Sequence, residues 1–399
     1  MGDSRSLSTK QPYNSIAFRI LVAVVWTYNT VFPLVKAVFA TLPYIGVLAD
    51  LLIPMSIFLT TMASLPWFLS RVRVSSIVVY VGAVMVVLFT MILHPATVDY
   101  LQEEWWRILV AAVPMYFIGI SFDLENSKND LFWCSLFSVL GMFIFRIYLI
   151  NSGRDLENDD MEAAYRMLPS IMYLIYYASV KKQVVYVAIA AAASLVILIF
   201  GTRGPIVCIL VYVAVLTIYL TLKSRNAKKL IILLIVFAII LSVFISDTLF
   251  IKVATTLSDR FEDIGFSTRI FNFIIEGDIT ESRGRAVLAE NTKEAILQNP
   301  LWGYGITGDR ALMGIYPHNI FLEILCQYGV IFGSLLIVAI VAVTITALIK
   351  TRKDSKRFSF ALMLVSLVFV KLMISSTYTI EPILYFMMGY FALTVRKKN

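Results

Sequence analysis

The sequence predicts an all-α integral membrane protein with about twelve transmembrane helices and one large outward-facing loop that contains short helices. Composition is the first reason: 59% of the 399 residues are hydrophobic and 15% are charged, whereas soluble domains carry about 25% charged residues. The second reason is a series of apolar runs near the length that crosses a bilayer, which is about 20 residues. The third is a single long polar interruption between residues 249 and 318.

Twelve apolar segments follow one another along the chain, nine before the polar interruption and three after it. We therefore predict an N-terminal transmembrane bundle over residues 1–248, a periplasmic or extracellular loop over 249–318, and C-terminal transmembrane helices over 319–399. The segments lie near residues 15–35, 43–65, 74–94, 106–121, 131–150, 164–180, 184–201, 205–222, 230–248, 319–349, 358–376 and 378–395.

Lysine and arginine in the short loops predict the orientation, because cytoplasmic loops carry an excess of both. With the N-terminus inside, the basic residues of alternate loops fall on one side, and the other side receives Lys36, Arg154, Arg203 and an acidic run at 155–162. Both termini are then cytoplasmic, and the long loop faces outward. The polar N-terminus lacks a cleavage pattern, so we expect the first helix to act as the insertion signal. The basic residues on the inner side are Arg5, Lys10, Arg71, Arg73, Lys128, Lys181, Lys182, Lys223, Arg225, Lys228, Lys229, Lys350, Arg352, Lys353, Lys356, Arg357 and Arg396 to Lys398.

Charge and motif content argue against several classes of function. The net charge is +8, yet residues 249–318 hold seven basic and nine acidic side chains, so this loop does not form the basic stripe typical of a nucleic-acid binder. The three cysteines have no CxxC spacing, the acidic run at 155–162 lacks metal-ligand spacing, and no nucleotide fingerprint is present. We therefore predict no nucleic-acid partner, no metal and no cofactor, and an activated substrate group drawn from the membrane.

The polar interruption carries an ordered set of motifs. Gly284-Arg285 opens an amphipathic run, Ala286 to Gln298, which Asn299-Pro300 ends because proline disfavours helical backbone in the preceding residue. The turn Leu301-Trp302-Gly303-Tyr304-Gly305 follows, and later come Pro317-His318-Asn319, Glu323 and Gln327-Tyr328-Gly329. Long loops in compact proteins are usually functional. We expect two or more short helices at the membrane interface here, and polar side chains directly above a spanning helix.

This ordered set resembles the signature of the O-antigen ligase and O-antigen polymerase superfamily, which includes Wzy-type polysaccharide polymerases and WaaL-like ligases. The local similarity covers Gly284 to Gly333, about an eighth of the chain. The resemblance implies an architecture like that of GT-C glycosyltransferases in a bacterial plasma (inner) membrane. It also implies an undecaprenyl-diphosphate-linked oligosaccharide as substrate in synthesis of lipopolysaccharide or capsule, and a possible chain-length regulator as protein partner.

Arg203 lies in a tight predicted outer turn, Phe200-Gly201-Thr202-Arg203-Gly204-Pro205. An arginine at a helix end often only snorkels toward lipid headgroups. The flanking glycines permit close approach of backbone to a ligand, and a guanidinium can bind phosphate oxygens in bidentate fashion. The resemblance implies that Arg203 binds the lipid diphosphate.

Arg285 and His318 are the other two candidate catalytic residues. Arg285 taken alone is a solvated interfacial arginine, but the resemblance selects it over Arg283 through its spacing before Asn299-Pro300. His318 is one of two histidines, and at a helix start on the outer surface an imidazole can exchange protons near neutral pH. By resemblance, His318 and Asn319 match the His-Asn pair of the family, in which the histidine is implicated in catalysis. Arg203, Arg285 and His318 are expected to converge on one outward-facing cavity.

Several further residues are candidates for binding or support. Asn319, Glu323 and Tyr304 are predicted to contact substrate, with Glu323 more a supporting residue, while Trp302, Tyr304 and Tyr316 either stack on sugars or anchor the interface. Lys371 and Glu381 lie within apolar segments, where an unpaired charge costs about 2.5 to 3.5 kcal/mol, so we expect them to pair across the last hairpin.

These inferences favour a polymerase that transfers a growing glycan from undecaprenyl diphosphate onto a lipid-linked repeat unit. The first alternative is an O-antigen ligase, which transfers the glycan to lipid A core and has the same motifs. The second alternative is a lipid-linked oligosaccharide flippase or another transporter, which is also compatible with twelve helices. A transporter predicts charges spread through a central cavity and no need for His318.

Overall fold

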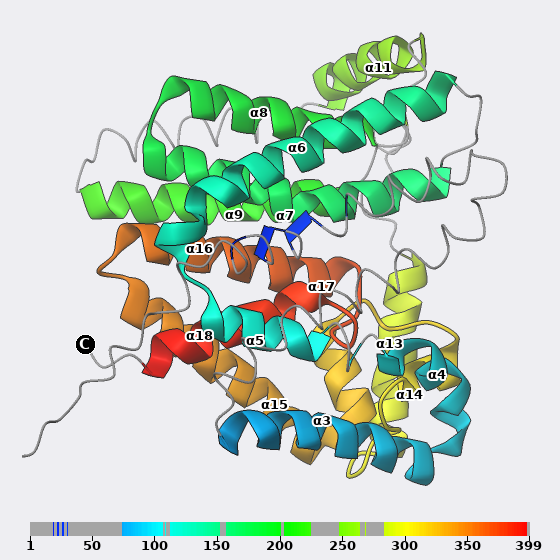
Figure 1. Ribbon diagram of the computed structural model, residues 1–399. Helices are drawn as coiled ribbons and strands as arrows, with labels where there is room; N and C mark the ends of the chain where they lie inside the picture. The colour runs from blue at the N-terminus through cyan, green and yellow to red at the C-terminus, as the bar shows by residue number, and fades with distance from the viewer. Residues whose placement is uncertain are drawn as a thin grey trace, which may run out of the picture.

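The computed structural model is helical throughout the residues it describes, and none of these residues forms a strand (Figure 1). The described residues are 19, 22–23, 26–27, 30, 74–106, 108, 112–151, 157–200, 203–224, 247–263, 268 and 283–396. The predicted segments at 43–65 and 230–248, and most of 15–35, lie outside them.

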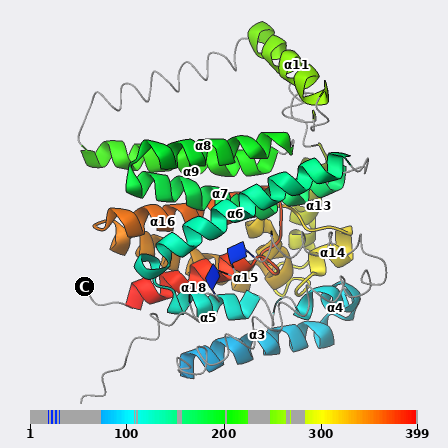
Figure 2. The same cartoon turned by 45° about the horizontal axis from the view of Figure 1, so that its top comes forward.

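One group of helices comprises α6 (Leu124–Asn151), α7 (Glu157–Lys181), α8 (Val184–Ile199) and α9 (Arg203–Ser224). They match the segments predicted at 131–150, 164–180, 184–201 and 205–222 to within a turn or two. Helix α7 packs against each of the other three. Figure 2 shows the four together on one side of the molecule.

A second group contains the C-terminal helices. Helix α15 (Ile320–Thr351) is followed by α16 (Ser355–Val365), the π-helical η5 (Ser366–Val370), α17 (Lys371–Ile374) and α18 (Pro382–Arg396). Helix α15 packs on α18, and α18 packs closely on the short α5 (Val113–Ser121). Glycines permit that contact, since a Cβ atom on Gly389 would lie 2.0 Å from the Tyr116 carbonyl oxygen.

The third group surrounds the N-terminal end of α15. Helix α3 (Val74–Leu93), the 3₁₀ turn η2 (Pro95–Thr97) and α4 (Val98–Trp106) form a bent pair of helices that meet at 110°. The segment predicted as the polar loop contains α11 (Asp247–Asp263), α13 (Arg283–Gln298) and α14 (Gly308–Met313). Helix α13 includes the amphipathic run predicted at 286–298, and both α13 and α14 contact α15.

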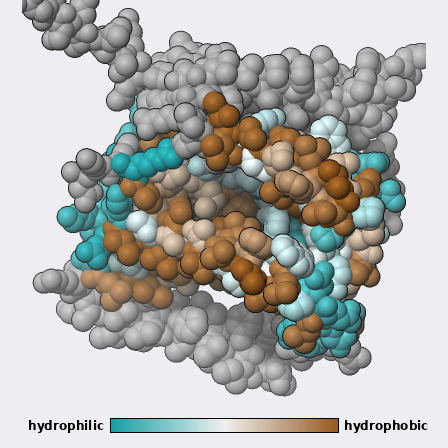
Figure 3. Space-filling model, turned by 90° about the horizontal axis from the view of Figure 1, so that it is seen from below, coloured by the Kyte–Doolittle hydropathy of each residue, from teal (hydrophilic) through white to brown (hydrophobic). Residues whose placement is uncertain are grey.

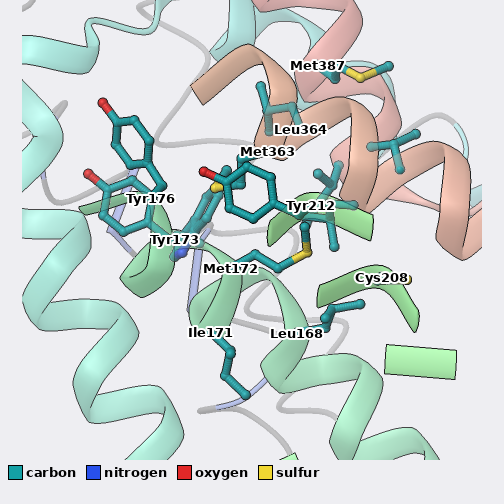
Figure 4. Close-up of a cluster of buried hydrophobic side chains, with 14 of the residues drawn as sticks. Leu168, Ile171, Met172, Tyr173, Tyr176, Cys208, Tyr212, Met363, Leu364 and Met387 are labelled. Atoms are coloured by element: carbon teal, nitrogen blue, oxygen red, sulfur yellow. The ribbon is translucent and has the colours of Figure 1, made fainter. Parts of the chain in front are cut away.

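A core of aromatic and sulfur-containing side chains joins the first two groups of helices. Tyr173 on α7, Tyr212 on α9 and Phe360 on α16 are fully buried, and the Tyr173 and Phe360 rings meet edge to face with centroids 6.3 Å apart. Figure 4 shows Met172, Tyr173 and Tyr176 of α7 beside Cys208 and Tyr212 of α9, with Met363, Leu364 and Met387 opposite. This packing fixes α7 and α9 against α16 and α18.

The apolar surface agrees with a membrane protein. Four helices in the described residues are long and apolar enough to span a bilayer, or five if the bent pair around η2 counts as one span. The total of about twelve therefore remains a prediction. Seen from below, hydrophobic side chains cover much of the middle of the described surface, and hydrophilic side chains gather toward its left and right ends (Figure 3).

The two ends of the bundle differ in their residues. At one end the side chains of Lys223 and Lys350 bond to Ser355 and the Val395 carbonyl, which brings together the ends of α9, α15 and α18 and the start of α16. At the opposite end the starts of α9, α15 and α18 meet the segment 375–381 and helices α4, α13 and α14 (Figure 1). The candidate site residues lie at this second end.

Candidate functional site

The turn at 299–305 docks its backbone onto a kink in α15. Gly329 interrupts the helix with φ 71° and ψ 174°, and Gly303 also has positive φ. A Cβ atom on Gly303 would lie 2.4 Å from the Gly329 nitrogen, and one on Gly329 would lie 2.4 Å from the Leu301 carbonyl oxygen. Three backbone hydrogen bonds close the contact: Tyr304 N to Cys326 O at 3.0 Å, Gly305 N to Gln327 O at 2.8 Å, and Val330 N to Pro300 O at 2.6 Å.

This docking explains why the sequence motifs occur as an ordered set. Glycine tolerates positive φ and lets another backbone approach closely. Gly303 in the turn and Gly329 in α15 therefore together allow the two backbones to pack against each other. Asn299 stabilises the turn, because its side-chain amide donates a hydrogen bond to the Gly303 carbonyl at 2.6 Å. These contacts hold α13 and the turn against the N-terminal part of α15.

Asn319 and His318 stand where α15 begins. The Asn319 side-chain oxygen accepts from the backbone nitrogens of Phe321 at 3.0 Å and Leu322 at 3.2 Å, as expected of an N-cap residue. The predicted helix start beside His318 is therefore confirmed. His318 itself has φ 51°, a left-handed conformation that costs energy in a residue with a Cβ atom. The cap and this backbone turn set the direction of the imidazole.

The His318 imidazole is half-buried and uncharged. Burial, together with the smaller effect of the positive charge of Arg285, lowers its pKa from 6.5 to about 4. Its ring centroid lies 4.5 Å from that of Tyr316, and its buried Nδ1 atom has no hydrogen-bond partner among the described residues. An imidazole that is neutral at physiological pH can accept a proton, which is what a general base requires.

The structure brings Arg285 and His318 together, and it brings the start of α9 to the same region. Arg285 lies exposed in the first turn of α13. Arg203 is the first residue of α9, and its neighbour Gly204 touches Tyr165 of α7, which in turn interacts electrostatically with Arg285. The Arg203 side chain lies outside the described part of the structure, so the convergence of all three side chains remains a prediction.

Sequence reasoning missed a buried charge cluster around Arg310. The guanidinium of Arg310, in α14, has its Nε atom 3.2 Å from Glu104 Oε1, its Nη1 atom 3.3 Å from Asp309 Oδ1 and its Nη2 atom 3.6 Å from Glu323 Oε1. Side-chain exposure is 7% for Arg310, 11% for Glu104 and 1% or less for the other two carboxylates. Burial raises the pKa of Asp309.

Polar side chains of α15 and of the segment 375–381 complete this Arg310 cluster. The Gln327 amide donates to Asp309 Oδ1 at 2.7 Å, and Gln327 also accepts from the Tyr378 hydroxyl. In the segment 375–381, Thr377 donates to Glu323, and Thr379 donates to Glu104 at 2.7 Å. The Arg310 cluster therefore ties α4, α14, α15 and 375–381 together. Nothing in the spacing of Asp309-Arg310 within the polar loop indicates such burial.

Glu323 and Tyr304 have internal partners that favour a supporting role over direct contact with substrate. Glu323 is buried within the Arg310 cluster. The Tyr304 hydroxyl donates to the Ala295 carbonyl at 3.2 Å, which braces the turn against α13. Their assignment as substrate ligands stays a prediction.

The aromatic candidates differ in what their rings contact. Trp302 is 70% exposed and lies beside Phe332, with centroids 6.2 Å apart, which favours interface anchoring. Tyr316 lies between two side chains of the site, since the Arg310 guanidinium is 5.3 Å from its ring centroid and His318 is its other neighbour. Its hydroxyl accepts from the Ser376 nitrogen at 3.2 Å. Tyr316 thus links the Arg310 cluster to His318.

The predicted pairing of Lys371 with Glu381 is confirmed, with the Lys371 Nζ atom 2.6 Å from Glu381 Oε2. Ser376 also donates to Glu381 at 3.1 Å, and the Lys371 ammonium lies 5.8 Å from the Tyr165 ring centroid. In the described residues, no group of three His, Cys, Asp or Glu side chains is arranged to hold a metal ion.

Comparison with protein families assigns the segment that carries these residues. Residues 188–337 match the model of a family described as O-antigen ligase. This match over 188–337 supports the O-antigen ligase and polymerase superfamily for the segment that carries the motifs. The matched residues include the superfamily candidates Arg203, Arg285 and His318, and also Arg310, whereas Glu104 and Lys371 lie outside the match. Neither a curated protein nor a solved structure matches the chain.

Proposed function

We propose that this protein is a polysaccharide polymerase that transfers a growing glycan from undecaprenyl diphosphate onto a lipid-linked repeat unit at the outer face of the bacterial plasma membrane. The family match supports glycosyl transfer from a lipid-linked oligosaccharide. The observation that carries the proposal is the neutral, half-buried His318 beside Arg285. That pair combines a proton acceptor with a cation where a phosphorylated lipid would bind.

In the proposed reaction, the acceptor hydroxyl oxygen forms a bond to the anomeric carbon of the donor glycan. The bond between that carbon and the diphosphate oxygen breaks, and its electron pair leaves with undecaprenyl diphosphate. The hydroxyl proton moves to the His318 imidazole, which returns it to solvent. Arg203 and Arg285 stabilise the charge that develops on the leaving diphosphate, as donors placed at developing charge do. The arginines perform this role in a metal-independent transfer.

Alanine variants of Arg203, Arg285 and His318 test the catalytic assignment. We expect each to shorten the glycan and to reduce polymerisation by about 100-fold or more, the range seen when a general base or charge-stabilising group is lost. Lys293→Ala is the matched control, because Lys293 lies on α13 like Arg285 but pairs with Glu290 at 2.6 Å. Normal chain length in correctly inserted Arg203, Arg285 and His318 variants would contradict the proposal and favour a flippase or another transporter.

The products of a deletion strain separate the polymerase from the ligase. A polymerase deletion leaves surface glycan with a single repeat, while a ligase deletion leaves long glycan on undecaprenyl diphosphate. We favour the polymerase because such enzymes are diverse and the match does not reach residues 1–187. If the long glycan accumulates on the lipid carrier, the protein is a ligase that transfers it to lipid A core.

A further inference from the structure

Tyr165 lies at the point where the candidate site residues approach one another, although no sequence motif singles it out. It stands near the start of α7, and its hydroxyl rests on the backbone of Gly204 in the first turn of α9. A Cβ atom on Gly204 would lie 1.7 Å from the Tyr165 hydroxyl oxygen and 2.7 Å from the ring carbon that carries it. Gly204 therefore makes room for Tyr165, whereas the sequence suggested that this glycine makes room for a ligand.

The surroundings of the Tyr165 hydroxyl are rich in positive charge. Arg203 adjoins Gly204 in the chain, Arg285 is close enough to interact electrostatically with Tyr165, and the Lys371 ammonium is 5.8 Å from its ring. Glu381 neutralises Lys371, so Arg285 supplies the positive charge near this hydroxyl among the described residues, and we expect the adjoining Arg203 to add to it. Such a region favours an anion over a neutral ligand.

The hydroxyl also has a polar neighbour that holds it in place. The Tyr165 and Ser375 side chains share a hydrogen bond, and Tyr316 is near enough to interact with Tyr165. A phenol has one proton to donate and can accept as well, so it can bind Ser375 while directing its proton to an anion. A neutral hydroxyl near Arg285 adds a short hydrogen-bond donor to a positively charged region.

We propose that the Tyr165 hydroxyl is a further phosphate-binding group of this site and donates a hydrogen bond to a diphosphate oxygen of the lipid-linked substrate. This inference rests on the proposed function, because it assigns Tyr165 to the same diphosphate that Arg203 and Arg285 bind. It places one phosphate-binding residue on α7, which lies entirely before residues 188–337. The diphosphate would then contact α7, α9 and α13 together.

Binding of farnesyl diphosphate to the full-length protein in phosphatidylcholine nanodiscs tests this assignment by isothermal titration calorimetry. Tyr165→Phe removes only the hydroxyl, and we expect the dissociation constant to rise about tenfold or more, as for loss of a hydrogen bond to a charged group. Tyr212→Phe is the matched control, since Tyr212 is a buried tyrosine of the same bundle whose hydroxyl faces the Ser359 carbonyl at 3.4 Å. Inorganic pyrophosphate as a second probe shows whether the lipid tail is needed.

Ser375→Ala shows whether the Tyr165 hydroxyl binds the diphosphate or only stabilises the fold. It also provides a second measurement if Tyr165→Phe does not fold. Both substitutions break the bond between Tyr165 and Ser375, but only Tyr165→Phe removes the hydroxyl. We expect Ser375→Ala to retain wild-type affinity. Equal weakening in the two variants, or weakening by Ser375→Ala alone, would overturn the inference, and so would wild-type affinity in Tyr165→Phe. Failure of the wild-type protein to bind either probe would instead count against the proposed function itself.

Discussion

At the scale of single residues, the site depends on the protonation state of His318. Burial and the Arg285 charge both disfavour the imidazolium, so the neutral form prevails down to a pH of about 4. If His318 is the general base, polymerisation declines as pH falls through about 4 and not through the ordinary histidine value of 6.5. Part of the charge effect on this pKa comes from Arg285, which we also propose as a ligand of the diphosphate.

Arg285→Gln tests that electrostatic coupling directly. Removing the positive charge stabilises the imidazolium, so we expect the His318 pKa to rise, while burial still keeps it below 6.5. NMR titration of protein with labelled histidine measures the value, and His94→Gln assigns the second histidine signal. Lys293→Gln, which removes a charge from the exposed side of α13, should leave the His318 titration unchanged. An unchanged titration in Arg285→Gln would contradict the coupling.

Arg310 shows how a single residue escapes prediction from sequence. An arginine beside an aspartate in a polar loop usually forms a solvated pair, but here both side chains are buried, and Arg310 also pairs with Glu323 on α15 and with Glu104 on α4. A buried charge is tolerated when it is paired and hydrogen-bonded. The partners that make burial possible come from residues more than two hundred positions apart, so no local pattern encodes them.

At the scale of elements, the turn at 299–305 and the kink of α15 form one docking unit. Positive φ at Gly329 bends the helix, and the freed backbone groups receive the turn. The sequence contained both glycines and the Asn299-Pro300 helix stop, and it predicted the end of α13 and the start of α15. It did not indicate that the glycines face each other, because that contact forms only after the chain has folded.

Gly329→Ala should disrupt this docking unit. The new methyl group meets the Leu301 carbonyl at 2.4 Å and sits on backbone with φ 71°, so we expect a loss of more than about 1 to 3 kcal/mol, the usual cost of backbone strain alone. Gly314→Ala is the matched control, because Gly314 has φ 75° with open space around it. Thermal unfolding in detergent compares the two. Equal melting temperatures would show that close approach contributes nothing.

At the scale of the whole molecule, the two ends of the helical bundle carry different chemistry. Described basic residues that follow or precede spanning helices, such as Lys223, Lys350 and Lys356, lie at one end. Arg285, His318 and the Arg310 cluster lie at the other. The positive-inside rule predicts that the basic end is cytoplasmic, so we expect the candidate site to lie on the outer face.

Labelling of single introduced cysteines with a membrane-impermeant maleimide tests this orientation in intact spheroplasts. Trp302→Cys, at the exposed turn, should react from outside, because Trp302 is 70% exposed at the end that carries the site. Lys353→Cys, at the exposed end of α15, should react only after the membrane is opened. Both variants are made in a Cys134→Ser background, since Cys208 and Cys326 are buried. The reverse labelling pattern would place the site in the cytosol and contradict the proposed function.

The sequence alone determined that the chain is helical and apolar, where its long helices run, and which ordered motifs mark the polar segment. These features depend on composition and short-range periodicity, which local residues encode. Only the tertiary structure decided that Gly204 accommodates Tyr165, that Gly303 meets Gly329, and that Arg310 gathers three carboxylates. Each of these contacts joins distant parts of the chain, so each depends on how the helices pack and not on the preferences of any one segment.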